Sequence, residues 1–274
     1  MIVVTSWGVA GSWRDAGAEG RAQWGVPRGG AADRWSLDIA NRLVGNTANA
    51  PGFESSGGLA FTVTDHAIVV AVAGGVATLR TEGGPAVAWG TPTVLPAGCR
   101  IRIERLTGGA RLYVAVRGGL QPTADGTGTG ARFVVGADPA TALATQAAVR
   151  RPAPGRLDVW PGPRLDWFHP DSWHALCNAE FVASAAADRV GVRLDGPSLV
   201  RTTHRELPPE GLVEGAIQVP PDGRPVVMLA DHPTTGGYPV IAVVDPGHVR
   251  HVAQLAPGAS IRFRAAPGSA FGGS

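Results

Sequence analysis

Short apolar runs closed by Gly, Pro or Asp recur along the whole chain, which is typical of strands separated by turns. From 99 to 105 apolar and charged residues alternate, as expected of a strand with one buried face. Runs of this kind predict strands at 68–73, 99–105, 111–117, 157–160, 190–194, 216–219, 226–229, 240–244 and 260–264. With 39 Gly and 23 Pro to form turns, the pattern predicts a mainly β protein.

Helices are expected at three places. The clearest begins after Asp33, whose carboxylate suits an N-cap, and ends at Gly45. Leu37, Ala40 and Leu43 give this segment one apolar stripe. Two shorter helices are predicted at 171–177 and 248–255.

An internal echo indicates two domains. The stretches LPAGCRIRI at 95–103 and LAPGASIRF at 255–263 both read as a glycine turn that enters a strand. A chain of 274 residues is long enough for two domains of about 130 residues each. Residues 121–154, rich in Gly, Ala and Thr, form the predicted linker, which gives domains at 1–150 and 151–274.

Composition excludes several mechanisms. All 24 basic side chains are Arg, and the chain has no Lys. A P-loop lysine, a Schiff base on a side chain, a biotin-carrying lysine and a Ser-Lys amidase are therefore excluded. The net charge is only +2 and the arginines are dispersed, so nucleic acid is not an expected partner.

A cytoplasmic location is expected. No apolar run approaches the roughly 20 residues that span a bilayer, and the apolar start has no basic region before it. Cys99 and Cys177 lack CxxC spacing, which favours a reducing compartment. No metal site is predicted, because the His248/His251 and His174/Cys177 pairs have no third ligand.

Polar residues collect at the strand ends between 206 and 241. Asp231 follows a predicted strand, as a general base or an acceptor for a substrate N–H would; capping its own turn is the alternative. Gln218 offers both a carbonyl and an NH2, which would match a lactam or urea; a surface position on an alternating strand is its alternative. Hydroxyls and unhindered N–H groups follow at Thr234, Thr235, Gly236, Gly237 and Tyr238.

A second group contains two arginines. The forks of Arg189 and Arg193 could each bind a carboxylate in bidentate fashion. Pairing of Asp188 with Arg189 to pin a turn is the favoured interpretation for that pair, which leaves Arg193 for a ligand. Glu210 and Glu214 flank a glycine-containing bend before Gln218. They could supply a further carboxylate, but solvated turn residues are the favoured interpretation.

The chain resembles one family along most of its length. The matching stretches are GVPRGGAAD at 25–33, ANRLVGN at 40–46, DRVGVRLDG at 188–196 and EGLVEGAIQVPPDGRPVVMLADHPTTGGYP at 210–239. They are similar to the C component of bacterial 5-oxoprolinase, also called allophanate hydrolase subunit 2, the KipA-like part of a biotin-dependent carboxyltransferase. The chain departs from the family at 12–18 and at 126–130. Asp15, Gly29, Gly30 and Asp33 match family motifs, but no catalysis is expected from the N-terminal half.

The resemblance implies two cyclophilin-like β-barrel domains and one subunit of an ATP-dependent 5-oxoprolinase, a lactam hydrolase. The implied partners are a KipI-like protein, known as the B component of 5-oxoprolinase or as allophanate hydrolase subunit 1, and a LamB/YcsF-like protein. ATP use belongs to the complex. Asp231 and Gln218 are the predicted catalytic residues. The predicted substrate-binding residues are Arg189, Arg193, Thr234, Thr235, Gly236, Gly237 and Tyr238.

Two alternatives stay open. The chain could be the carboxyltransferase subunit of a urea carboxylase or allophanate hydrolase-like system, with biotin arriving on another chain. It could also be a non-catalytic regulatory protein that binds a KipI-like partner.

Overall fold

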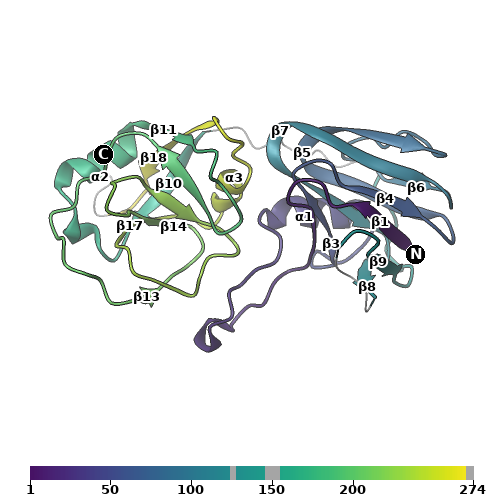
Figure 1. The fold of residues 1–274 in the computed structure, drawn as a ribbon, viewed down its shortest axis with the longest axis horizontal. Coiled ribbons are helices and arrows are strands. Elements are labelled where there is room, and N and C mark those ends of the chain that lie inside the picture. Colours follow the sequence, from purple (N-terminus) through teal and green to yellow (C-terminus); the bar gives the residue numbers. More distant parts are fainter. Residues whose placement is uncertain (124–127, 146–154, 270–274) are drawn as a thin grey trace. The chain divides into compact units, whose positions relative to one another are not determined.

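The computed structural model describes residues 1–123, 128–145 and 155–269, which divide into two compact units (Figure 1). The first unit comprises Met1–Gly17 and Asp33–Pro152; the second comprises Ala18–Ala32 and Ala153–Ser274. The second unit thus includes a segment from near the start of the chain, called the arm below (Ala18–Ala32). The predicted division at 150/151 did not anticipate this segment.

The first unit is built on a curled nine-stranded sheet. Its order is β2-β3-β7-β4-β1-β9-β8, and β5 pairs with both β6 and β7. The strands are β1 (Ile2–Ser6), β2 (Ser12–Arg14), β3 (Gly52–Ser55), β4 (Ala60–Val63), β5 (Ile68–Glu82), β6 (Thr93–Leu95), β7 (Arg100–Val116), β8 (Leu120–Pro122) and β9 (Arg132–Val135).

Two sequence predictions in this unit were wrong. The runs at 99–105 and 111–117 are one strand, β7, because β5 and β7 stay paired through several register shifts instead of turning at the glycines between the runs. Part of the predicted linker lies in the sheet, because β9 pairs with both β1 and β8. Residues 124–127 and 146–154 of that linker lie outside the described residues.

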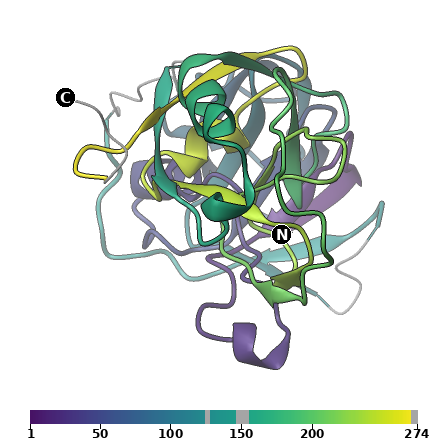
Figure 2. The ribbon, with the colours of Figure 1, turned by 90° about the vertical axis from the view of Figure 1, so that its left-hand side faces the viewer.

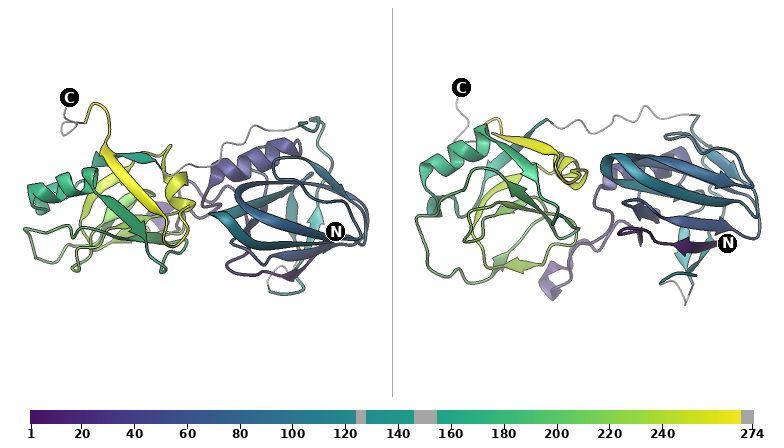
Figure 3. Two further views of the ribbon diagram at one scale, coloured as in Figure 1. Left: turned by 90° about the horizontal axis from the view of Figure 1, so that it is seen from above. Right: turned by 45° about the horizontal axis from the view of Figure 1, so that its top comes forward.

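Helix α1 (Arg34–Leu43) packs on the sheet against β5 and β7 (Figure 3). Its predicted N-cap is confirmed, because Asp33 accepts a hydrogen bond from the backbone N of Ser36 at 3.0 Å. The backbone N of Asp33 donates to the hydroxyl of the fully buried Tyr113 at 2.8 Å, and that hydroxyl donates to Glu54 at 2.8 Å. The start of α1 is therefore tied to the sheet as well as capped.

The second unit contains a closed barrel of order β10-β17-β14-β15-β12-β11-β18 (Figure 2). Its strands are β10 (Arg156–Pro161), β11 (Glu180–Ala183), β12 (Gly191–Asp195), β14 (Ala216–Gln218), β15 (Val226–Met228), β17 (Val240–Val244) and β18 (Ser260–Ala265). Parallel pairing of β10 with β18 closes the ring. A two-stranded ribbon of β13 (Glu210–Gly211) and β16 (Thr235–Gly236) accompanies it.

Short helices complete the second unit: η1 (Ala22–Trp24) in the arm, η2 (Leu165–Trp167), α2 (Pro170–Asn178) and α3 (Val249–Ala253). The barrel core includes Val159, Phe181, Ile217, Ile241 and Phe263, none of them accessible to solvent. Burial of each such side chain contributes about 1.5–3 kcal/mol. No helix among the described residues is long and apolar enough to cross a membrane.

The predicted fold class was mainly β, with two cyclophilin-like β-barrel domains and a few short helices. It is confirmed, with a closed seven-stranded barrel in the second unit and a curled sheet in the first. The internal echo is also confirmed as a pair of similar turns. Gly98 and Gly258 both have a φ of 83°, a left-handed conformation that suits glycine. A backbone hydrogen bond closes each turn before the chain enters β7 or β18. The N–H of Cys99 donates to the carbonyl of Pro96 at 3.1 Å, and the N–H of Ala259 donates to the carbonyl of Ala256 at 2.9 Å.

The cap of α1 gives a stability prediction. Replacing the buried Asp33 with Ala removes the acceptor for Ser36 and is expected to lower the free energy of unfolding by about 1–2 kcal/mol in urea titrations. Asp38→Ala is the control, because it removes a carboxylate of the same helix that pairs with the exposed Arg42. Equal destabilisation by the two variants would contradict the capping role.

Candidate functional site

The arm is fixed to the barrel by an arginine and a carboxylate. Arg189, just before β12, donates from Nε to Asp231 at 2.8 Å and from Nη2 to the other carboxylate oxygen at 3.0 Å. Its Nη2 also donates to the carbonyl of Gly30, and the N–H of Gly29 donates to the carbonyl of Ala230 at 2.9 Å. Asp231 therefore holds the arm through Arg189.

This bidentate pair was not predicted from the sequence, which favoured pairing of Arg189 with Asp188. The Asp188 carboxylate instead accepts from the backbone N–H groups of Val190 and Gly191, at 2.8 and 3.0 Å, and so caps its own turn. Arg189 itself reaches a carboxylate that follows β15. Pairing of Asp188 with Arg189 to pin the turn stays a prediction.

A pocket of about 380 Å³ lies between the arm and the loops that follow β13 and β15. Its polar lining comes from Glu19, Arg28, Glu214, His232 and Thr234. Its apolar and small lining residues are Ala18, Gly20, Ala22, Val26, Pro27, Leu212 and Val213. Two carboxyl groups, a guanidinium and an imidazole thus share one small, largely apolar pocket, which is a common setting for proton transfer.

Glu214 is the most perturbed acid in this pocket. Its side chain is only 17% exposed, which corrects the prediction of a solvated turn residue. Burial raises the pKa of its carboxyl group, although the positive charges of Arg28, His232 and Arg189 all act to lower it. Arg28 lies 3.7 Å away through Nη1 and also pairs with Glu19. Burial outweighs these charges, so Glu214 retains a proton more readily than an exposed glutamate does.

Little in the sequence indicated this role. Glu214 stands beside Gly215 in a stretch that resembles a solvated bend. Its burial depends on the arm, which comes from the opposite end of the sequence. His232 was missed for the same reason; it is 6% exposed, with Nδ1 2.7 Å from the carbonyl of Pro233.

Gln218 is buried at the end of β14, at 5% exposure, so its surface alternative is wrong. Its Nε2 donates to the carbonyl of Tyr238 at 3.0 Å, which fixes the amide and its orientation. Gly236, in β16, leaves room for it: a Cβ there would lie 2.6 Å from Nε2 of Gln218. Gly236 of the TTGG stretch therefore packs against Gln218. Contact of this stretch with a substrate stays a prediction.

The remaining predicted ligand residues are spread along this part of the unit. Thr234 lines the pocket, and its carbonyl accepts from the N–H of Leu212 at 2.9 Å. Thr235 pairs with Gly211 in the ribbon, and Gly237 follows it. Tyr238 is 46% exposed. These residues were predicted as one group, and the structure brings only Thr234 to the pocket.

Two charged residues are already paired elsewhere. Arg193 donates to Asp222 at 2.8 Å, so its guanidinium already has a carboxylate partner, and its contact with a ligand stays a prediction. Glu210 forms an ion pair with Arg164, which lowers the pKa of its carboxyl group chiefly through the hydrogen bond. Neither residue lines the pocket.

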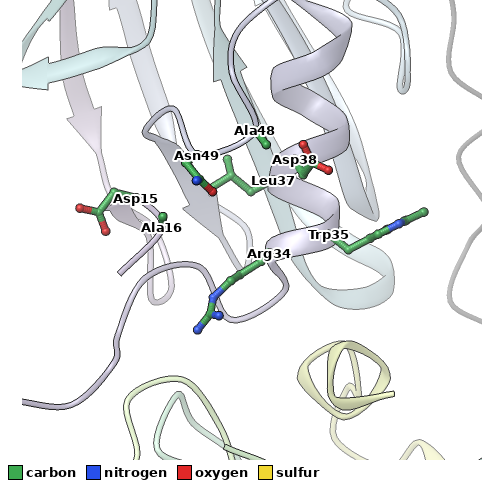
Figure 4. A pocket seen from close by; sticks show the side chains of 8 residues that line it. All are labelled: Asp15, Ala16, Arg34, Trp35, Leu37, Asp38, Ala48 and Asn49. Carbon is green, nitrogen blue, oxygen red and sulfur yellow. The ribbon is translucent and has the colours of Figure 1, made fainter. Parts of the chain in front are cut away.

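The first unit has a smaller pocket of about 230 Å³ beside α1 (Figure 4). Asp15, Arg34, Asp38 and Asn49 supply its polar lining, with Leu37 between them. Asp15 already accepts from the backbone N–H of Gly17 at 2.9 Å, a turn-capping role. The described residues contain no group of three His, Cys, Asp or Glu side chains arranged to hold a metal ion.

The glycines at the end of the ribbon give a matched test of the packing around Gln218. Gly236→Ala is expected to lower the free energy of unfolding by about 1–3 kcal/mol, because the new Cβ overlaps Gln218 and Leu212. Gly237→Ala is the control, since its Cβ would meet nothing closer than 3.6 Å. Urea unfolding of both variants measures the difference, and similar stabilities would show that Gly236 is not a packing constraint.

Comparisons with known proteins all indicate the same family for this chain. A model described as carboxyltransferase domain, subdomain A and B, matches residues 24–127 and 128–265. The chain is 34% identical over 284 residues to the C component of the 5-oxoprolinase of Escherichia coli (strain K12), covering 96% of this chain and 90% of that protein. It is also 28% identical to the urea amidolyase of Saccharomyces cerevisiae, of which it covers 15%.

Solved structures agree with this. The crystal structure of TTHA0988 has 32% identity and a TM-score of 0.84 over 96% of this chain. The chain spans 55% of the length of TTHA0988. The Kluyveromyces lactis urea carboxylase has 25% identity and a TM-score of 0.84, and the match covers 27% of that protein. This chain belongs to the carboxyltransferase-domain family that includes the C component of 5-oxoprolinase, as its sequence motifs had indicated.

Proposed function

We propose that this chain is one subunit of a hetero-oligomeric, ATP-dependent 5-oxoprolinase that acts with a KipI-like partner. The observation that carries the proposal is the near end-to-end match with the C component of 5-oxoprolinase, whereas urea amidolyase is matched over a small fraction of its length. A LamB/YcsF-like protein is the second expected partner. TTHA0988 extends well beyond the matched region, which is compatible with a chain that works beside further domains.

The pocket supplies groups that suit opening of a lactam ring. When the ring C–N bond breaks, the nitrogen must gain a proton, and attack by water on the carbonyl must release one. Glu214, whose raised pKa favours its protonated form, is the proposed proton donor to the nitrogen. Arg28, on the facing arm, offers a positive charge to the carboxylate of 5-oxoproline.

The other roles are divided between this chain and its partners. An unstrained amide is a poor substrate for water, so use of ATP to activate the lactam oxygen is part of the proposal. The chain has no lysine and no nucleotide-binding motif, which supports the proposal that ATP is used at the level of the complex. Asp231 and Gln218 are proposed to orient the ring, with Asp231 acting through its hold on the arm.

Carboxyl transfer is the second candidate, favoured by the family description and by the likeness to urea carboxylase. The ureido ring of biotin presents an N–H next to a C=O, as a lactam does, so the same pocket could accept either. The absence of lysine requires biotin to arrive on another chain. Regulation of a KipI-like partner without catalysis is the third candidate.

The first experiment measures glutamate release from 5-oxoproline and ATP. The chain is co-expressed with its two candidate partners, and a control lacks this chain. Release that requires the chain is expected, and Asp231→Ala is expected to abolish most of it because the arm loses its anchor. Full activity of an assembled Asp231→Ala complex would end the case for that residue; an assembled but inactive wild-type complex would favour carboxyl transfer or regulation.

Glu214→Gln tests the pocket in two ways. Without a proton to transfer, glutamate release should fall by about 10²-fold. The raised pKa of Glu214 means that the folded chain binds more protons than the unfolded chain, so its contribution to stability is lost as pH rises above the ordinary value of 4.5. The Gln variant should therefore gain stability over the wild type as pH rises from about 5 to about 8.

Urea unfolding across that pH range measures the second effect. The exposed Glu206→Gln is the control and should change neither activity nor the pH dependence of stability. A Glu214→Gln variant with full activity would rule out Glu214 as the proton donor.

A further inference from the structure

A loop of the second unit, 201–205, concentrates groups that can donate hydrogen bonds. Its sequence is Arg-Thr-Thr-His-Arg, which gives two guanidinium groups, two hydroxyls and an imidazole in five consecutive residues. The backbone of the loop is fixed to the end of η2. The N–H of Thr202 donates to the carbonyl of Trp167 at 2.8 Å, and the N–H of His169 donates to the carbonyl of Val200 at 3.0 Å.

The side chains of this loop are mostly unused inside the unit. Among the described residues, the hydroxyls of Thr202 and Thr203 and the ring of His204 have no hydrogen-bond partner. Arg205 is exposed; its guanidinium carbon stands 5.0 Å from the ring centre of Trp167, and it has no carboxylate partner in the described part of the chain. The backbone is held while the polar side chains stay available.

Arg201 is the unusual member. It is half-buried, Nη2 donates to the carbonyl of Val219, and the guanidinium carbon stands 6.0 Å from the ring centre of Tyr238. Its Nε is buried and has no hydrogen-bond partner among the described residues. No carboxylate of those residues lies within ion-pair distance of it. Burial lowers the pKa of its guanidinium, although Tyr238 and the more distant Asp222 act to raise it.

Other arginines of the unit do have carboxylate partners: Arg164 with Glu210, Arg189 with Asp231, Arg193 with Asp222 and Arg224 with Asp195. A positive charge that is partly withdrawn from water and has no carboxylate in direct contact is costly. A bound anion would remove that cost for Arg201. The same anion would find a second guanidinium nearby in sequence, at Arg205.

We propose that the loop 201–205 is a binding site for a phosphate group, held by Arg201 and Arg205 with the threonine hydroxyls. Phosphate is favoured over carboxylate because its oxygens can accept from several donors at once, and this loop offers guanidinium, hydroxyl and imidazole donors together. The site is separate from the Glu214 pocket, because the two lie at opposite ends of β14. Glu214 precedes this strand, whereas Arg201 is hydrogen-bonded to the carbonyl of Val219, which follows it. The proposal does not depend on the proposed function.

Isothermal titration of the full chain with inorganic phosphate at low ionic strength tests the site. Saturable binding of one phosphate is expected, and Arg201→Gln and Arg205→Gln should each weaken it by about tenfold. Arg262→Gln is the matched control, because this exposed arginine of the same unit is paired with Glu180. Arg205 is exposed, so its variant keeps the test valid even if Arg201→Gln disturbs folding.

Titration with acetate separates the two anion classes, and acetate should bind about tenfold more weakly than phosphate. Acetate binding as tight as that of phosphate would overturn the assignment to phosphate. Absence of saturable phosphate binding, or an equal loss in Arg262→Gln, would overturn the site itself.

Discussion

The Arg189–Asp231 ion pair is the interaction on which the candidate site depends. One guanidinium, only 12% exposed, bonds both oxygens of Asp231 and also the carbonyl of Gly30. It therefore joins two loops of the barrel unit to the arm. A bidentate pair of this kind fixes direction as well as distance. The arm in turn supplies one wall of the pocket, so this pair helps to hold that wall in place.

The electrostatics of the pocket follow from that closure. Glu214 lies under the arm, where loss of water raises its pKa more than the surrounding positive charges lower it. Arg28 is shared between Glu19 and Glu214 and cannot neutralise both. Asp231, by contrast, is committed to Arg189. Two carboxylates of one unit therefore have different tasks, one holding structure and the other suited to proton transfer.

Packing sets the position of Gln218 in a similar way. The amide is held by the carbonyl of Tyr238, and Gly236 provides the space that any side chain would fill. The two glycines after Thr235 thus differ in their surroundings, because a Cβ added at Gly237 would lie no closer than 3.6 Å to another atom. The sequence predicted all of 234–238 to bind the ligand. In the structure Gly236 packs against Gln218, whereas Thr234 lines the pocket.

The sequence by itself determined the local features. A short apolar run predicted β17 (Val240–Val244) residue for residue, and Asp33 caps α1 as expected, because such runs and caps depend on neighbours in the chain. The absence of lysine was also decisive, since it excluded whole classes of mechanism. Only the tertiary structure decided which charges pair and which are buried. Asp231 takes Arg189, and the arm buries Glu214, because these contacts join segments that folding brings together from distant positions in the chain.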